Sequence, residues 1–273
     1  MNWKNLFAPG EDFSVAQAKE YMEARGADAY QLLDVRQPKE YEEGHLAGAK
    51  LIPLKELPGR LDELEKGKPV IVYCAVGGRS KAAAQLLAGK DFASVYNMVG
   101  GIKAWQGHQA RGQEEAGLEF FTGQEEYEDG VSLAYAMEDG LQEFYRLMAG
   151  RAKDEEERQL YTRLMGLEDM HKARLLAEYR QTHGPEAMPG KAVAGIMEGG
   201  GRVQDFLVRA ETHLHGKRDI LELAMALETQ ALDLYSRMAQ KSTQQEVRAF
   251  FLRLADEEKA HLAYLADALD KVL

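Results

Sequence analysis

The second half of the sequence contains two copies of a short pattern that could bind metal. Glu168 is followed three residues later by His171. Ninety residues further along the chain, Glu258 is followed at the same spacing by His261. On a helix, side chains three residues apart leave the same face, so each pair would present a carboxylate beside an imidazole. The two pairs therefore predict two similar ligand sites on two helices.

Each pair has a further glutamate thirty residues upstream, Glu138 for the first and Glu228 for the second. Both lie among apolar residues at helical spacing, where burial of an unpaired carboxylate is costly. Four carboxylates in one core would also repel one another, and two divalent cations would remove both penalties. Mixed carboxylate and imidazole ligands in a helical bundle favour iron or manganese over copper or structural zinc. The predicted cofactor is a pair of iron ions, with manganese as the alternative.

Cys74 is the single cysteine, so it can form neither an internal disulfide nor a four-cysteine metal site. It follows an apolar run and precedes a short loop at the start of a predicted helix. Such a loop points backbone N–H groups at an anion, and the helix N-terminus adds positive potential, so the thiol pKa falls. We expect Arg79 and Lys81 to strengthen this effect. The residues predicted to surround the sulfur are Ala75, Val76, Gly77, Gly78, Arg79 and Ser80.

A thiolate in this loop is a nucleophile that could take a sulfane sulfur and hold it as a persulfide. The alternative is a tyrosine phosphatase, which also uses a cysteine loop that ends in arginine. Phosphatase loops are one residue longer than this one, in which four residues separate Cys74 from Arg79. The shorter loop fits a sulfur atom better than a phosphate group.

The elements that must position Cys74 alternate between strands and helices. Apolar runs at 32–34, 70–74 and 94–97 predict strands, and the second has no polar alternation, as is typical of a parallel strand buried on both faces. Capping-box spacing at Ser14 predicts a helix towards Arg25, and residues 79–87 predict another. The alternation predicts an α/β domain with a parallel sheet, which we assign to residues 1–108.

The elements that must position the glutamates and histidines are helices. Residues 109–123 are polar and contain glycine, so they are predicted to be a linker. Residues 183–216 are predicted to form a long connection, with a short helix near 203–212. Two short turns and this crossover predict a ferritin-like four-helix bundle over residues 124–273. Apolar residues recur at helical spacing in four segments, at 125–149, 154–182, 217–239 and 244–273.

An internal repeat relates the two halves of this predicted bundle. Residues 136–173 align with residues 226–263 without a gap, so that Tyr145 falls on Tyr235. Both Glu-x-x-His pairs and both upstream glutamates match in this alignment. The repeat indicates two helical hairpins that descend from one.

Composition limits the remaining possibilities. The sequence has 273 residues, of which 45% are hydrophobic and 29% charged, so it is long enough for two folded domains. Its formal net charge of −11 argues against a general affinity for nucleic acid or anionic membranes. No apolar run is long enough to span a bilayer, and the first residues lack the apolar segment of a signal peptide. The expected compartment is the cytoplasm.

The first domain resembles the rhodanese family. The resemblance is carried by Asp34-Val35-Arg36 with Glu40-Tyr41, by the segment from Gly44 to Ala49, by the Cys74 loop and by the segment from Val99 to Trp105. It implies a sulfurtransferase that takes sulfur from thiosulfate, a polysulfide or a persulfide and passes it to a thiol acceptor. In this family the chemistry lies in the cysteine loop, so Cys74 and Arg79 are the expected catalytic residues. Asp34, Arg36 and His45 are expected to hold the structure.

Residues 124–273 resemble the ferritin-like domain of rubrerythrins. The resemblance implies a carboxylate-bridged di-iron site that reduces hydrogen peroxide, and it implies that Tyr145 and Tyr235 hydrogen-bond to ligand carboxylates. Rubrerythrins proper have a second glutamate on the third helix, but Met225 and Ala231 occupy the positions three residues from Glu228. They also usually carry a four-cysteine rubredoxin domain. The implied metal ligands are Glu138, Glu168, His171, Glu228, Glu258 and His261.

Three hypotheses follow for the whole chain. The two sites could form an enzyme pair, in which Cys74 handles sulfane sulfur and the metal site consumes peroxide or oxygen with electrons from a separate donor. The bundle could instead sense redox state or metal and regulate the sulfur carrier without turnover of its own. It could also be a metal-free dimerisation module. A homodimer is expected in each case, because ferritin-like domains often dimerise.

Overall fold

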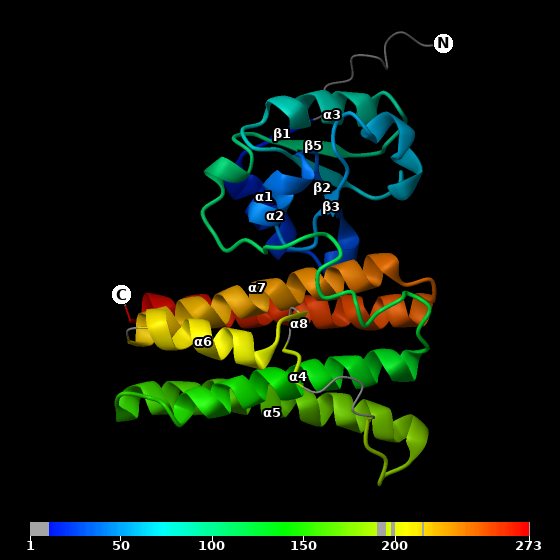
Figure 1. Cartoon of the computed structure of the whole chain (residues 1–273). Coiled ribbons are helices and arrows are strands. Elements are labelled where there is room, and N and C mark those ends of the chain that lie inside the picture. Colours follow the sequence, from blue (N-terminus) through cyan, green and yellow to red (C-terminus); the bar gives the residue numbers. More distant parts are fainter. Residues whose placement is uncertain (1–10, 190–194, 198–199, 215, 273) are drawn as a thin grey trace. The chain divides into compact units, whose positions relative to one another are not determined.

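The computed structural model describes residues 11–189, 195–197, 200–214 and 216–272. The chain divides into two compact units between Glu115 and Ala116. The first unit combines strands and helices, and the second is helical, as Figure 1 shows. This confirms the predicted fold classes. Among the described residues, no helix combines the length and the apolar composition needed to cross a membrane.

The first unit contains a five-stranded sheet in which every pairing is parallel. The strand order is β1-β5-β4-β2-β3, so β4, which precedes the cysteine loop, is central. All four residues of β4 are buried, as expected from its unbroken apolar run. The strands are β1 (Glu11–Phe13), β2 (Gln31–Asp34), β3 (Lys50–Leu51), β4 (Val70–Tyr73) and β5 (Val95–Met98).

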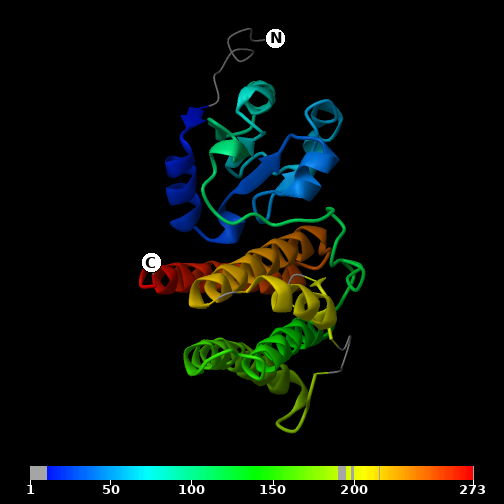
Figure 2. The same cartoon turned by 60° about the vertical axis from the view of Figure 1, so that its left-hand side comes forward.

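Helices cover both faces of this sheet (Figure 2). Alternate residues of β4 point to opposite sides, because successive side chains of a strand do so. Val70 and Val72 pack in the same core as α3, whereas Ile71 and Tyr73 pack in the core that contains α1 and α2. The helices are α1 (Val15–Glu23), α2 (Pro38–Glu43) and α3 (Gly78–Ala88). The predicted capping box between Ser14 and Gln17 is present at the start of α1.

The described residues of the second unit form two helical hairpins and one additional helix. Helices α4 and α5 pack closely against each other, as do α7 and α8, and α6 lies against α4 in the long connection. The five helices are α4 (Tyr127–Ala149), α5 (Glu155–His183), α6 (Val203–His213), α7 (Lys217–Lys241) and α8 (Gln245–Asp270). The hairpins correspond to the two halves of the internal repeat.

The segment 109–123, predicted to be a linker, divides between the two units. Ala110 pairs with His45 through reciprocal backbone hydrogen bonds of 2.9 Å in the first unit. Phe121 is buried in the second unit, where its ring meets that of Phe251 edge-on. Backbone pairing and side-chain burial therefore fix much of this polar segment to one unit or the other.

Candidate functional sites

Cys74 lies directly after β4, at the carboxyl end of the parallel strand, and its side chain is buried. The backbone N–H of Gly77 donates a hydrogen bond to Sγ of Cys74 at 3.1 Å, and Oγ of Ser80 lies 3.5 Å from the same sulfur. Gly77 has a φ of 104°, a left-handed conformation that glycine adopts readily, and it caps the start of α3. The loop thus turns from strand to helix around the sulfur atom.

A second segment supports the cysteine loop from behind. The N–H of Ile102 donates to the carbonyl of Cys74 at 2.8 Å, and that of Lys103 donates to the carbonyl of Ala75 at 3.1 Å. A Cβ atom at Gly101 would lie only 2.2 Å from the Cys74 carbonyl oxygen, so a side chain there would displace the loop. The Gly100-Gly101 turn therefore allows close backbone contact with the sulfur site.

The environment of Cys74 favours the thiolate. Burial acts to raise the pKa of Cys74, but hydrogen bonds from the Ser80 side chain and from the backbone of Ser80, Val76 and Gly77 outweigh it and lower the pKa below its ordinary value. Hydrogen bonds to a charged form stabilise that form. The sulfur is thus prepared to act as a nucleophile near neutral pH.

Two polar residues that sequence reasoning missed extend this hydrogen-bond network. Oγ of Ser80 donates to Oδ1 of Asn97 at 2.7 Å, and Nδ2 of Asn97 donates to Oδ1 of Asp12 at 2.7 Å. The contact with Asp12 orients the Asn97 amide so that its oxygen faces Ser80. The serine hydroxyl has one proton, and the acceptors within its reach are Asn97, Cys74 and the carbonyl of Gly77.

Arg79, predicted to be catalytic, forms a double ion pair with Glu40 of α2. Nη2 lies 2.6 Å from Oε1 and Nη1 lies 2.7 Å from Oε2 of the carboxylate. The hydrogen bond from Arg79 is the main reason that the pKa of Glu40 falls to about 2. Much of the charge of Arg79 is therefore balanced before any substrate arrives, and its catalytic role stays a prediction.

The other residues of the rhodanese-like signature have structural contacts. Arg36 and Asp34 form a buried ion pair at 2.6 Å, and Nη2 of Arg36 also donates to the carbonyl of Gly44 at 2.7 Å. The ring of His45 stacks on that of Tyr41 at a centroid distance of 3.5 Å, and its Nδ1 lies 2.8 Å from the Tyr41 carbonyl. These contacts join α2 to the end of β2.

The helical unit contains two clusters that could each hold a metal ion. In each, one ligand atom from every member lies within 4.8 Å of the others. All four glutamates are almost completely buried, with at most 2% of each exposed. The first cluster consists of Glu138, Glu168 and His171, and the second of Glu228, Glu258 and His261.

Each histidine directs the same ring nitrogen into its own cluster. Nδ1 of His171 lies 3.3 Å from Oε2 of Glu138 and 3.4 Å from Oε2 of Glu168. In the other half, Nδ1 of His261 lies 3.0 and 3.5 Å from the two carboxylates of its cluster. The two clusters adjoin, because the imidazole rings stack 4.1 Å apart. The structure thus brings all six predicted ligands into one centre.

The pKa values of the residues in this centre indicate that its buried carboxylates are stabilised by positive charge. Burial raises the pKa of Glu138 to about 8. Burial acts to lower the pKa of His171, but hydrogen bonds to Glu138 and Glu168 raise it to about 11. For Glu228, burial acts to raise the pKa, and interactions with Glu258 and with the nearby His261 imidazole lower it overall. Shared protons therefore offset part of the negative charge.

The donor set fits divalent metal ions. Oε2 of Glu228 is buried and forms no hydrogen bond with any described residue, although Nδ1 of His261 lies 3.5 Å away. Such an oxygen is expensive to bury unless something binds it, and a cation would do so. Carboxylate oxygens with one imidazole nitrogen in each cluster suit iron or manganese.

On α7, the residues three positions from Glu228 provide no second carboxylate ligand. Met225 and Ala231 occupy the positions three residues before and after Glu228, and both are buried. Neither side chain offers the oxygen ligand expected in a rubrerythrin proper. Tyr145 and Tyr235 are also buried, and their predicted hydrogen bonds to the ligand carboxylates stay a prediction.

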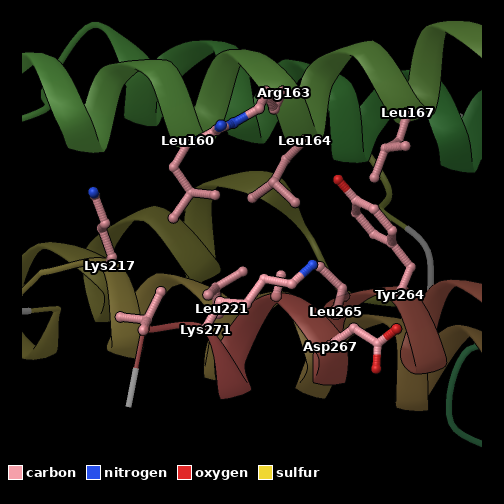
Figure 3. Close-up of a pocket in the computed structure, with 12 residues that line it drawn as sticks. Leu160, Arg163, Leu164, Leu167, Lys217, Leu221, Tyr264, Leu265, Asp267 and Lys271 are labelled. Carbon is pink, nitrogen blue, oxygen red and sulfur yellow. The ribbon is translucent and has the colours of Figure 1, made fainter.

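A cavity in the same unit was not foreseen from the sequence. It has a volume of about 330 Å³ and lies between α5, α7 and α8 (Figure 3). Leucines and three basic side chains line it. Leucines at helical spacing indicate a packed core, and no sequence pattern shows that they border a cavity.

Both units match models of known protein families. The model of the rhodanese-like domain matches residues 14–108, and the model named rubrerythrin matches residues 219–272. The second match covers α7 and α8, which carry one of the two metal clusters. The internal repeat extends the same ligand pattern to α4 and α5.

Individual relatives match the first unit alone. An uncharacterized protein of Bacillus subtilis, YqhL, is 47% identical over 77 residues, which cover 28% of this chain and 61% of that protein. Thiosulfate sulfurtransferase GlpE of Coxiella burnetii is 38% identical over 77 residues, which cover 28% of this chain and 72% of that protein. A rhodanese-like domain protein of Staphylococcus aureus has a crystal structure with 28% identity and a TM-score of 0.32, covering 35% of this chain and 91% of that one.

Proposed function

Since the chain belongs to the rhodanese family through residues 14–108 and also contains a rubrerythrin domain, we propose that it transfers sulfane sulfur through Cys74 and reduces peroxide or oxygen at a di-iron centre. The main support for sulfur transfer is the buried Cys74 sulfur, which accepts a backbone hydrogen bond at 3.1 Å and has a lowered pKa. GlpE, the similar protein of Coxiella burnetii, is a thiosulfate sulfurtransferase.

The proposed sulfur transfer has two steps. The Cys74 thiolate attacks the outer sulfur of thiosulfate, a polysulfide or a persulfide. The S–S bond of the donor breaks, a new S–S bond forms on Cys74, and the rest of the donor leaves as sulfite or a thiolate. A thiolate acceptor then attacks the outer sulfur of the Cys74 persulfide and releases Cys74 as a thiolate. Backbone N–H groups of the loop stabilise the negative charge in both states.

The proposed metal centre uses the two clusters of the helical unit. Two iron ions, or manganese in their place, would supply the electron transfer that reduces peroxide or oxygen. The four carboxylates would hold the ions and offset their charge, and His171 and His261 would bind through Nδ1. Burial of all four carboxylates limits the access of water to them. The single cysteine of the sequence cannot form a rubredoxin site, so we propose that electrons come from outside these residues.

Two variants test the two activities separately. Cys74→Ser should abolish sulfur transfer from thiosulfate to cyanide and leave peroxide consumption by the iron-loaded protein unchanged. The double variant Glu168→Ala/His261→Ala should abolish peroxide consumption and leave sulfur transfer unchanged. Normal sulfur transfer in Cys74→Ser would refute the first assignment, and undiminished peroxide consumption in the double variant would refute the second.

The same samples test whether the helical unit regulates the rhodanese unit instead. If sulfur transfer changes with the oxidation state of the metal while peroxide is not consumed, the bundle is a sensor. If sulfur transfer is the same in metal-free and metal-loaded protein, the two units work independently. The molecular mass of these samples in solution also tests the expected homodimer.

A further inference from the structure

The cavity between α5, α7 and α8 has the size and the lining of a small-molecule site. Its volume of about 330 Å³ falls in the range of such sites, roughly 300–1,000 Å³. Leu160, Leu164, Leu221 and Leu265 form part of its lining, and all four are buried residues of the bundle core. Figure 3 shows these leucines on both walls of the cavity. An apolar group of a ligand could therefore pack against the core itself.

The cavity lies close to the metal clusters along the same helices. Leu164 precedes Glu168 by four residues on α5, and Leu265 follows His261 by four residues on α8. Residues four apart on a helix lie on one face, about one turn from each other. The apolar lining thus continues the two faces that carry the ligands. A molecule in the cavity would be a near neighbour of the centre.

Positive charge also lines the cavity. Arg163, Lys217 and Lys271 contribute to the lining, and Asp267 is the one acidic residue among them. This is unusual in a chain of net charge −11. Lys217 pairs with Glu156 at 2.8 Å, but neither Arg163 nor Lys271 has an ion pair with any described residue. A guanidinium without a carboxylate partner is well suited to bind one from a ligand.

The two ends of the cavity differ in their distance from the metal ligands. Figure 3 shows Lys217 and Tyr264 at opposite ends. Tyr264 is three residues from His261, which corresponds to about 4.5 Å along the axis of α8. Lys217 is eleven residues from Glu228, which corresponds to about 16 Å along α7. The end near Tyr264 is therefore closer to the metal ligands.

We propose that this cavity binds an alkyl carboxylate of medium chain length. The carboxylate binds at Arg163 and Lys217, and the hydrocarbon chain covers the leucines with its free end towards the metal centre. A neutral lipid would leave the arginine without a carboxylate partner, and a small anion would make no contact with the leucines. An amphipathic anion satisfies both parts of the lining.

The test is a calorimetric titration of the full-length protein with decanoate, decanol and acetate. Decanoate should bind saturably, decanol more weakly and acetate not at all. The variant Arg163→Gln should weaken decanoate binding about tenfold, because the loss of one hydrogen bond between charged groups lowers affinity by about that factor. The matched control is Arg158→Gln, which removes the same charge from an exposed position on α5 that does not line the cavity. This control should bind decanoate normally.

A second variant keeps the test independent of charge. Ala268→Phe should fill the cavity and abolish decanoate binding, and circular dichroism shows whether it folds. Absence of decanoate binding to the wild type, or equal binding by all variants, would overturn the proposal. Dimerisation that Ala268→Phe weakens, without decanoate binding, would also overturn it, because a second copy would then cover the leucines. Metal content is measured on the same samples, so a failure of the metal assignment is seen separately.

Discussion

The imidazole rings of His171 and His261 stack at a centroid distance of 4.1 Å, with 14° between their planes. The two residues come from different helical hairpins and from equivalent positions of the internal repeat. Their contact therefore joins two clusters, each built within one hairpin, into a single centre. Repetition of one hairpin is a simple way to place two similar metal sites side by side.

The first prediction concerns the metal content of this centre. Glu168→Ala/His261→Ala removes one carboxylate and one imidazole, one from each cluster, and should reduce bound iron from about two ions per chain to almost none. Glu156→Ala/Glu246→Ala is a matched control, because these glutamates are also equivalent in the repeat but lie outside both clusters. Atomic emission measures the metal in both. Equal metal content in the two double variants would contradict the assignment.

The second prediction concerns the pKa of Cys74. Because the folded protein lowers this pKa, alkylation by iodoacetamide should remain fast until the pH falls through the lowered value, since only the thiolate reacts. Ser80→Ala removes a hydroxyl that lies 3.5 Å from the sulfur and can donate to it, so the pKa should rise and the alkylation profile should shift to higher pH. Ser94→Ala in the same unit is the control and should leave the profile unchanged. A profile unaffected by Ser80→Ala would show that the hydroxyl does not stabilise the thiolate.

The third prediction concerns the ion pair between Arg79 and Glu40. Glu40→Gln removes the charge that balances Arg79 but keeps a side-chain oxygen for the backbone N–H of Gln37. The released guanidinium should attract doubly charged thiosulfate and lower its KM about threefold, the scale of an exposed ion pair. Glu43→Gln is the control, because it removes the same charge from α2 and leaves the ion pair between Arg79 and Glu40 intact. Identical KM values for the two variants would mean that Arg79 does not meet the donor.

The fourth prediction concerns the stability of the first unit. Asp34→Ala leaves the buried guanidinium of Arg36 without its carboxylate, which should lower the free energy of unfolding by about 3–5 kcal/mol. The exposed Asp62→Ala should change it by less than about 0.5 kcal/mol. Denaturant unfolding followed by tryptophan fluorescence measures both, because both tryptophans of the sequence precede residue 116, where the second unit begins. A small loss in Asp34→Ala would show that the pair contributes little to the fold.

Sequence reasoning found the parts of both sites that depend on local spacing. The Glu-x-x-His pairs share a helical face whatever the tertiary structure, and the repeat indicated that the two hairpins are alike. The loop after a buried strand likewise follows from a run of neighbouring residues. These features could be predicted because each is determined by residues close together in the sequence.

The features that were missed depend on contacts between distant segments. The pair of Glu40 with Arg79 and the contact of Asn97 with Asp12 join residues far apart in the chain, and no local pattern marks them. Strands β1 and β3 are only three and two residues long, too short to show alternation. The cavity was missed because spacing shows which face of a helix is apolar but not whether another helix fills it.

The most direct test of the central claim is the intact mass of the protein after incubation with thiosulfate or a polysulfide. The account predicts that wild-type protein gains the mass of one sulfur atom, that the gain maps to Cys74, and that cyanide or a thiol removes it. The variant Cys74→Ser should gain nothing, and Glu168→Ala/His261→Ala should gain as much as the wild type. If wild-type protein gains no sulfur from either donor, Cys74 is not a sulfur carrier and the proposed function is wrong.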